Sequence, residues 1–145
     1  STPLDDVVRR HIGDRASRVY STRSAVETGA VLTLGSDFAA SAYVLTYKPL
    51  TLIESAVTRR VAGDTDGDPL PPADEALSVE QALRAMTIDA ARQLRINEIA
   101  GSLQVGKDAD LVALGKDLFD IAPHEIAATP VVLTMRAGRI THEAL

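Results

Sequence analysis

Apolar side chains recur at helical spacing in the first two thirds of the chain. The most regular pattern covers 78–94, where an apolar residue returns every three or four positions over about four turns. A Ser-x-x-Gln capping box opens this stretch at Ser78 and predicts where the helix begins. Thr51 and Glu54 repeat the capping-box spacing, which predicts a second helix over 51–60.

Two further helices are predicted closer to the beginning of the sequence. Thr2-Pro3 is followed by acidic residues, a composition typical of a first helical turn. The stretch 14–28 has a helical pattern that stops at Gly29, a residue that favours the left-handed conformation after a helix. Turn-forming residues dominate 63–72, which is therefore predicted to be a surface loop.

The remaining apolar runs have the pattern of strands. The run 30–36 is short and almost continuously apolar, which predicts a strand buried on both faces of a parallel sheet. Later β-type runs cover 111–114, 131–135 and 139–142, and the Ala-Gly pair between the last two predicts a tight hairpin. Helices with one buried strand come first and antiparallel strands last, so the sequence predicts an α/β fold with a boundary near residue 95.

Composition and charge narrow the classes of protein to which the chain can belong. Of its 145 residues, 46% are apolar and 24% are charged, as in a soluble globular domain. Only 3% are aromatic, so the core must be built from Ala, Val, Leu and Ile. The net charge of -5, with no cluster of Lys and Arg, argues against nucleic-acid binding. No apolar run approaches the roughly 20 residues that span a membrane.

The absence of cysteine excludes a disulfide framework, a thiolate zinc site and a cysteine nucleophile. The first residues lack the basic and apolar regions of a signal peptide, so the cytoplasm is the expected compartment, with a signal further upstream left open. His11, His124 and His142 are far apart and form no His-x-His pair. We interpret each as a surface or helix-end residue rather than a metal ligand.

Asp37 is the first candidate for chemistry. It directly follows the predicted strand 30–36, and α/β proteins place ligands and catalytic groups at the carboxyl edge of the sheet. An aspartate there can bind a metal or its water and can act as a general base. Gly35-Ser36-Asp37 is equally consistent with a turn capped by its own side chains, and both interpretations stay open at this point.

The segment 101–112 is the second candidate. Two glycines five residues apart flank a β-type run, and Lys107, Asp108 and Asp110 precede the next strand. The spacing matches neither a Walker A loop nor a dinucleotide fingerprint. A pair of aspartates could bind a hard cation, but the pattern favours side chains that cap turns.

Taken in order along the chain, several segments resemble the C-terminal third of the amidohydrolase superfamily. The closest branch is the amidohydrolase-3 group, which includes N-substituted formamide deformylases and exoenzyme-regulatory proteins. The block most specific to the superfamily is Gly-x-Leu-x-x-Gly-Lys-x-Ala-Asp-Leu-Val, over 101–112. The segments that carry the resemblance are 21–29, 34–38, 56–60, 77–87, 101–114 and 133–140.

The resemblance implies a C-terminal fragment of a (β/α)8 TIM barrel with short antiparallel strands of an appended β-sandwich domain. Residues 1–95 would supply the last strand and helices of the barrel, and residues 96–145 the C-terminal part of the sandwich. Asp37 would stand at the catalytic mouth, where the family aspartate takes a proton from a metal-activated water and passes it to the leaving nitrogen. Phe38 would line the substrate pocket.

The implied metal centre cannot be completed by this sequence. The family binds one or two divalent ions, typically zinc, through a His-x-His, a carboxylate or modified lysine and further histidines, and this chain offers only Asp37 as a possible ligand. A whole barrel needs about 250 residues. We therefore expect an inactive fragment of a hydrolase that cleaves non-peptide carbon–nitrogen bonds of small amides or formamides, with metal bound only in the intact parent.

Two expectations complete this interpretation. The rival function is a stand-alone, non-enzymatic α/β module for assembly or binding. In a barrel fragment, the edge of strand 30–36 and the apolar faces of helices 51–60 and 78–94 would lie open. Self-association, or association with the rest of the parent, is therefore expected, with no nucleic-acid or membrane partner.

Overall fold

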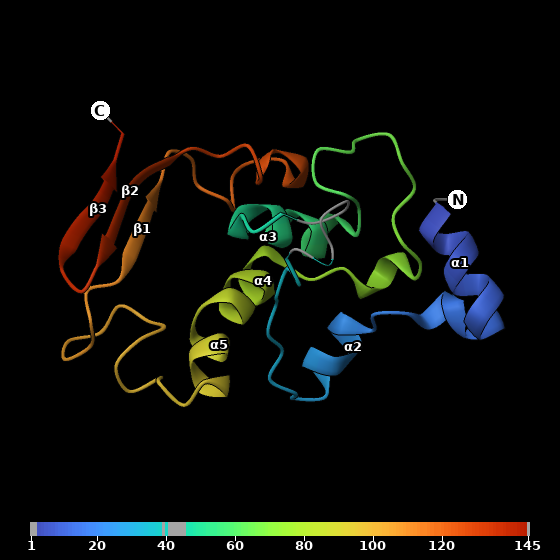
Figure 1. Cartoon of the computed structure of the whole chain (residues 1–145), viewed down its shortest axis with the longest axis horizontal. Helices are drawn as coiled ribbons and strands as arrows, with labels where there is room; N and C mark the ends of the chain where they lie inside the picture. Colours follow the sequence, from blue (N-terminus) through green and yellow to red (C-terminus); the bar gives the residue numbers. More distant parts are fainter. Residues whose placement is uncertain (1–2, 39, 41–45, 145) are drawn as a thin grey trace.

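The computed structural model describes residues 3–38, 40 and 46–144 and shows an elongated molecule (Figure 1). Helix α1 lies at one end and a sheet at the other, with α3, α4 and α5 between them. The predicted helix start at Thr2 lies outside the described residues. No helix in the described part is long and apolar enough to cross a membrane. The elements are α1 (Pro3–Ile12), η1 (Gly13–Arg18), α2 (Thr22–Glu27), α3 (Pro49–Thr58), η2 (Ala73–Glu75), α4 (Val79–Met86), α5 (Ile88–Gln93), β1 (Leu111–Leu114), η3 (Pro123–Glu125), β2 (Val131–Arg136) and β3 (Arg139–Glu143).

The hydrophobic core lies where α3 and α4 pack against each other. Leu32 and Leu34, from the segment that precedes Asp37, pack against it. Leu52 and Ile53 of α3 and Ala82 of α4 are thus covered within the chain, so the expectation of open faces is wrong for these residues, whereas Leu94, at the end of the predicted helix 78–94, is 67% exposed. The buried side chains of this cluster are Ile53, Leu77, Ala82, Leu118 and Ile126.

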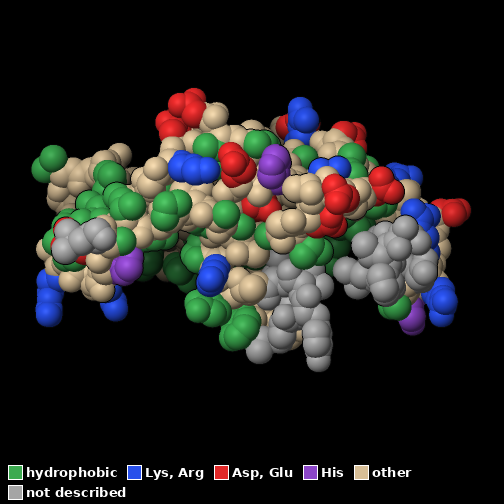
Figure 2. Space-filling view, turned by 90° about the horizontal axis from the view of Figure 1, so that it is seen from above, with side chains coloured by type: hydrophobic (Ala, Val, Ile, Leu, Met, Phe, Trp, Pro, Cys, Tyr) green, Lys and Arg blue, Asp and Glu red, His purple; other side chains and the backbone are tan. Residues whose placement is uncertain are grey.

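Exposed hydrophobic side chains are also found at the sheet end of the molecule (Figure 2), although Leu94, Leu103 and Val105, at the end of α5 and in the residues after it, are more exposed, at 67%, 74% and 108%. Val112 on β1 is 57% exposed, Ile140 on β3 is 54% exposed, and Phe119, after β1, is 63% exposed. Association with another chain, or with the rest of a parent protein, stays a prediction.

The sheet is antiparallel, in the order β1-β2-β3, as the three β-type runs predict. The predicted hairpin is present, with Arg136 paired to Arg139 across its turn. Within the turn Ala137 has a φ of 47°, and its N–H donates to Asp110 Oδ1 at 2.6 Å. Asp110 therefore caps this turn, as the interpretation of 101–112 predicts.

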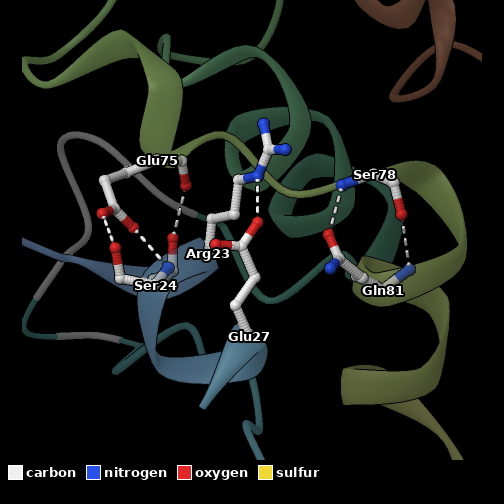
Figure 3. A network of polar contacts seen from close by, with 7 residues as sticks. Arg23, Ser24, Glu27, Glu75, Ser78 and Gln81 are labelled. Carbon is white, nitrogen blue, oxygen red and sulfur yellow. Dashed lines mark hydrogen bonds and ion pairs between the residues drawn. The ribbon is translucent and has the colours of Figure 1, made fainter. Parts of the chain in front are cut away.

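The predicted helix 78–94 is divided at Thr87. Its capping box is confirmed, because Ser78 Oγ accepts from the Gln81 N–H at 3.1 Å and Gln81 Oε1 accepts from the Ser78 N–H at 2.8 Å (Figure 3). Thr87 leaves the helical conformation, with φ −124° and ψ −98°. Its hydroxyl donates to the Leu83 carbonyl at 2.7 Å, the acceptor that a helical N–H would use. The apolar periodicity continues across this break and therefore did not reveal it.

The expected capping box at Thr51 and Glu54 is wrong. Helix α3 begins instead at Pro49, whose missing N–H suits the first turn. Glu54 is only 1% exposed, and its two carboxylate oxygens accept from the N–H of Gly63 at 2.6 Å and of Ala127 at 2.7 Å. The side chain of Glu54 therefore joins α3 to two segments outside the helix.

The predicted helix 14–28 is interrupted at Val19 and Tyr20. Arg59, which ends α3 with a φ of 54°, is 6% exposed, and its guanidinium donates to the carbonyl oxygens of Val19 at 3.1 Å and Tyr20 at 3.0 Å. A continuous helix would need these carbonyls for its own N–H groups. Burial lowers the pKa of Arg59 from its ordinary value. Its other acceptors are the carbonyl oxygens of Leu70 and Pro71.

Glu75 holds the start of α2, beyond this interruption (Figure 3). Its carboxylate accepts from the Ser24 N–H at 2.8 Å and from the Ser24 hydroxyl, and its backbone carbonyl accepts from the Thr22 hydroxyl at 2.8 Å. The hydroxyl and then the N–H of Ser24 hold the pKa of Glu75 below its ordinary value. Glu75 therefore caps a helix that lies 51 positions earlier in the sequence.

The predicted strand 30–36 is wrong for this structure. Residues 31–37 have neither helical nor strand structure, and Val31 is 58% exposed. A strand needs neighbours that bind its N–H and C=O groups. The strands that the structure describes are the antiparallel β1, β2 and β3, at the far end of the molecule. Among the described residues, the parallel sheet of a barrel is therefore absent.

Removal of the Glu54 carboxylate should destabilise the fold. We expect Glu54→Ala to lower the free energy of unfolding by about 1–3 kcal/mol, because two partly buried N–H groups lose their acceptor. Urea unfolding followed by circular dichroism measures this. Glu143→Ala, at an exposed position of β3, should change it by less than about 0.5 kcal/mol. Equal losses in the two variants would contradict the assigned role of Glu54.

Stability should depend on pH through Glu75. Because the pKa of Glu75 is lower in the folded than in the unfolded chain, ionised Glu75 favours folding. This contribution is complete above the unfolded value of about 4.3 and is lost as the pH falls through the lower folded value. We expect Glu75→Gln to flatten the decline in stability below about pH 4.3, measured by thermal melts across pH. Glu143→Gln should retain the slope, and an unchanged slope in Glu75→Gln would contradict the role of Glu75.

Candidate functional site

Asp37 lies at an exposed turn at the end of the segment that follows α2. Its φ of 48° is in the left-handed region, which few residues other than glycine adopt. Ser36 Oγ accepts from the Phe38 N–H at 3.2 Å and closes the turn around Asp37. The turn interpretation is thus part of the structure. It does not exclude the catalytic one, since strained backbone is common at functional sites and the side chain of Asp37 remains exposed.

Contacts along the segment restrict where Asp37 can lie. At its start, Glu75 binds Ser24 of α2. In its middle, the Thr33 hydroxyl donates to Gln93 Oε1 of α5 at 2.8 Å, and two leucines face the core. The segment is therefore held on both sides of its midpoint, which gives Asp37 a defined position although it is not in a sheet.

Two exposed aromatic rings lie next to this turn. Phe38 and Tyr47 make an edge-to-face contact, with ring centroids 5.6 Å apart and an interplanar angle of 73°. They are 59% and 68% exposed. The predicted substrate-binding residue Phe38 thus has an aromatic partner that we did not predict from the sequence. The sequence contains one hint of this pair. Only 3% of the residues are aromatic, so each aromatic side chain is a candidate for a specific role.

The described residues do not form a metal centre. They contain no group of three or more His, Asp and Glu side chains placed to hold an ion. His11 Nδ1 donates to the Val7 carbonyl at 2.8 Å and His142 Nε2 to the Val131 carbonyl at 3.2 Å, so both rings bind backbone. Asp37 alone does not fit a hydrolytic metal site, which typically needs three protein ligands.

The side chains of the block 101–112 bind other parts of the chain. Lys107 Nζ donates to Ser102 Oγ at 2.8 Å and to the Asn97 carbonyl. Together with the contact of Asp110 at the hairpin, these bonds join the loop after α5 to the sheet. Asp110 therefore caps a turn, in agreement with the interpretation from sequence.

A family model described as the amidohydrolase family matches residues 3–142. An N-substituted formamide deformylase from Arthrobacter pascens is 32% identical over 126 residues, which cover 87% of this chain and 22% of that protein. An imidazolonepropionase from Kosmotoga olearia is 29% identical over 123 residues, which cover 84% of this chain and 26% of that protein. Protein LONG AFTER FAR-RED 3 from Arabidopsis thaliana is 33% identical over 136 residues, which cover 93% of this chain and 22% of that protein. The chain thus spans about a quarter, or less, of the length of these relatives.

A solved structure has a similar fold. It is an adenosine deaminase from Xanthomonas campestris with bound zinc, with a TM-score of 0.61 and 21% sequence identity over 99% of this chain and 35% of that chain. At this identity the likeness concerns the fold alone. The family model, in contrast, covers nearly the whole sequence, including the turn around Asp37 and the block 101–112. The chain therefore belongs to the amidohydrolase family.

Proposed function

We propose that this chain is the C-terminal portion of a hydrolase that cleaves non-peptide carbon–nitrogen bonds of small amides or formamides. Membership of the amidohydrolase family supports this proposal, as does the similarity to a formamide deformylase. The chain matches about a quarter, or less, of its relatives' length, which supports the view that the complete active site needs residues outside it.

The position of Asp37 is the observation that carries the proposal. Its carboxylate is exposed on a turn with a left-handed backbone, at the end of a segment held by Ser24 and Thr33. A carboxylate there can accept a proton from the water that attacks the carbonyl carbon. It can then return that proton to the nitrogen as the carbon–nitrogen bond breaks. Asp37 thus gains one proton in the first step and loses it in the second, so the two steps together leave its protonation unchanged.

Phe38 and Tyr47 are the proposed wall of the substrate pocket beside Asp37. Their rings are more than half exposed and their edge-to-face contact orients each against the other. Such a pair suits an apolar substituent on the amide nitrogen or carbonyl.

The metal of the family is proposed to be bound by the rest of the intact protein. The described residues of this chain do not fit a hydrolytic centre, because they supply no group of three ligands. The chain alone is therefore proposed to be inactive. The rival function is a stand-alone binding module, which would need no hydrolytic metal centre.

In the intact protein, Asp37→Asn should reduce kcat by at least about 100-fold, because the amide cannot accept the proton. The side chains are nearly isosteric, so the melting temperature should change little. Initial rates on a panel of small amides and formamides measure the effect. Asp120→Asn, a matched change at another exposed aspartate, should keep kcat within about twofold of the original value. A normal kcat in Asp37→Asn would leave Asp37 with the role of a turn residue only.

The isolated chain should retain no stoichiometric zinc after dialysis and should not hydrolyse these substrates. Metal analysis by mass spectrometry and the same rate assays check both statements. One zinc retained per chain, and lost in Asp37→Asn, would show that this chain builds a metal site by itself and would overturn the proposed division between it and the rest of the protein.

A further inference from the structure

A cavity of about 580 Å³ lies between α5 and the residues that follow it, 97–107. Arg84 from α4, Arg92 from α5 and Lys107 from the loop line it, together with the neutral polar side chains of Ser102 and Gln104. This volume is in the range of small-molecule sites, about 300–1,000 Å³. None of these residues takes part in the proposed hydrolysis.

The walls of the cavity are fixed by close backbone packing. Gly101 has a φ of 86°, and a Cβ at this position would lie 2.5 Å from the Ala91 Cβ of α5. The loop is closed on itself, because the Asp108 N–H donates to the Ile99 carbonyl at 2.9 Å. Gly101 therefore allows the loop to approach α5 more closely than any residue with a Cβ would.

The two arginines are oriented by one carboxylate. Asp89 Oδ1 lies 2.9 Å from Arg92 Nη1 and 3.6 Å from Arg84 Nη2, and the Asp89 side chain is only 14% exposed. Each guanidinium has five N–H donors, and Asp89 engages one nitrogen of each. Both arginine side chains line the cavity and are about half exposed to solvent, so N–H donors that do not face Asp89 remain for a ligand.

Lys107 adds a charge that has no acidic partner among the described residues. Its Nζ donates to the Ser102 hydroxyl and to the Asn97 carbonyl, both of which are neutral, and no carboxylate of the described part lies within 4.0 Å. A partly buried ammonium without a counter-charge is costly. An anion in the cavity would offset this cost.

The balance of charge on the lining is positive. Three of its side chains are cationic, Glu98 of the lining is acidic, and Asp89 pairs with both arginines, so the net charge of these five side chains is +1 in a chain whose net charge is -5. Glu98 Oε1 accepts from the Asn97 side-chain amide at 3.2 Å. Paired arginines with a nearby lysine are the donor set that proteins use for phosphate, since the planar forks bind two oxygens each and the ammonium adds a point charge.

We propose that this cavity binds a small phosphate-bearing molecule, through Arg84, Arg92 and Lys107. The hydroxyl of Ser102 and the amide of Gln104 are placed on the same lining to bind the remainder of the molecule. The site uses neither Asp37 nor the aromatic pair. It is therefore independent of the proposed hydrolytic function.

Isothermal titration of the intact protein with inorganic phosphate, pyrophosphate and glycerol phosphate tests the proposal. We expect saturable binding of at least one of them, weakened about tenfold or more in Arg92→Gln, the scale of one charge-assisted hydrogen bond. Arg139→Gln removes the same charge from an exposed position of β3 and should change Kd by less than about twofold. Tighter binding of glycerol phosphate than of phosphate would identify a phosphate ester as the ligand, and the reverse order a free phosphate anion.

The proposal is wrong if none of the three compounds binds saturably, since the cavity is then closed or filled in the intact protein. It is also wrong if Arg92→Gln and Arg139→Gln weaken binding equally, since binding then follows net charge alone. Circular dichroism establishes that each variant is folded. Arg84→Gln, at the other guanidinium, replaces Arg92→Gln in the comparison if the latter does not fold.

Discussion

The buried guanidinium of Arg59 is the contact on which the arrangement of the N-terminal half depends. It draws the carbonyls of Val19 and Tyr20 to the end of α3 and so prevents one long helix from forming there. Helix α2 then begins anew, with Glu75 at its start, and its direction sets the course of the segment that carries Asp37. A cation can be buried at this point because the planar group finds several carbonyl dipoles in fork geometry, which a lysine could not match.

Part of this fold can be predicted from patterns that involve only a few neighbouring residues. The capping box at Ser78 and the hairpin at Ala137 each depend on residues close in the sequence, and both are present. Glu54 shows where such reasoning ends. Its spacing from Thr51 suggested a helix cap, but in the folded chain it binds Ala127, 73 positions away, and a single sequence contains no sign of such a pair. A predicted strand fails for a related reason, because 30–36 has the composition of a strand but no neighbour to pair with.

Part of the candidate site could likewise be predicted from the sequence, and part could not. Asp37 could be singled out because it follows an apolar run and stands in a pattern that resembles a family, and the match over 3–142 now shows that family. Tyr47 could not be found, since its relation to Phe38 exists only in three dimensions. The contact between Thr33 and Gln93, 60 positions apart, was equally hidden, although it helps to place Asp37. Under the proposed function, the chain would contribute an acid–base group and an apolar wall, and the metal would be bound by the rest of the intact protein.

The contact of Glu54 with Ala127 also has a consequence for the order of folding. The antiparallel sheet joins strands that follow one another closely, so the entropy lost in closing its loops is small, whereas the Glu54 contact closes a loop of 73 positions. The sheet end can therefore form while α3 is still unattached. During that interval Leu52 and Ile53, buried in the final structure, are exposed to solvent. Apolar side chains left open in this way are what makes a partly folded chain prone to aggregate.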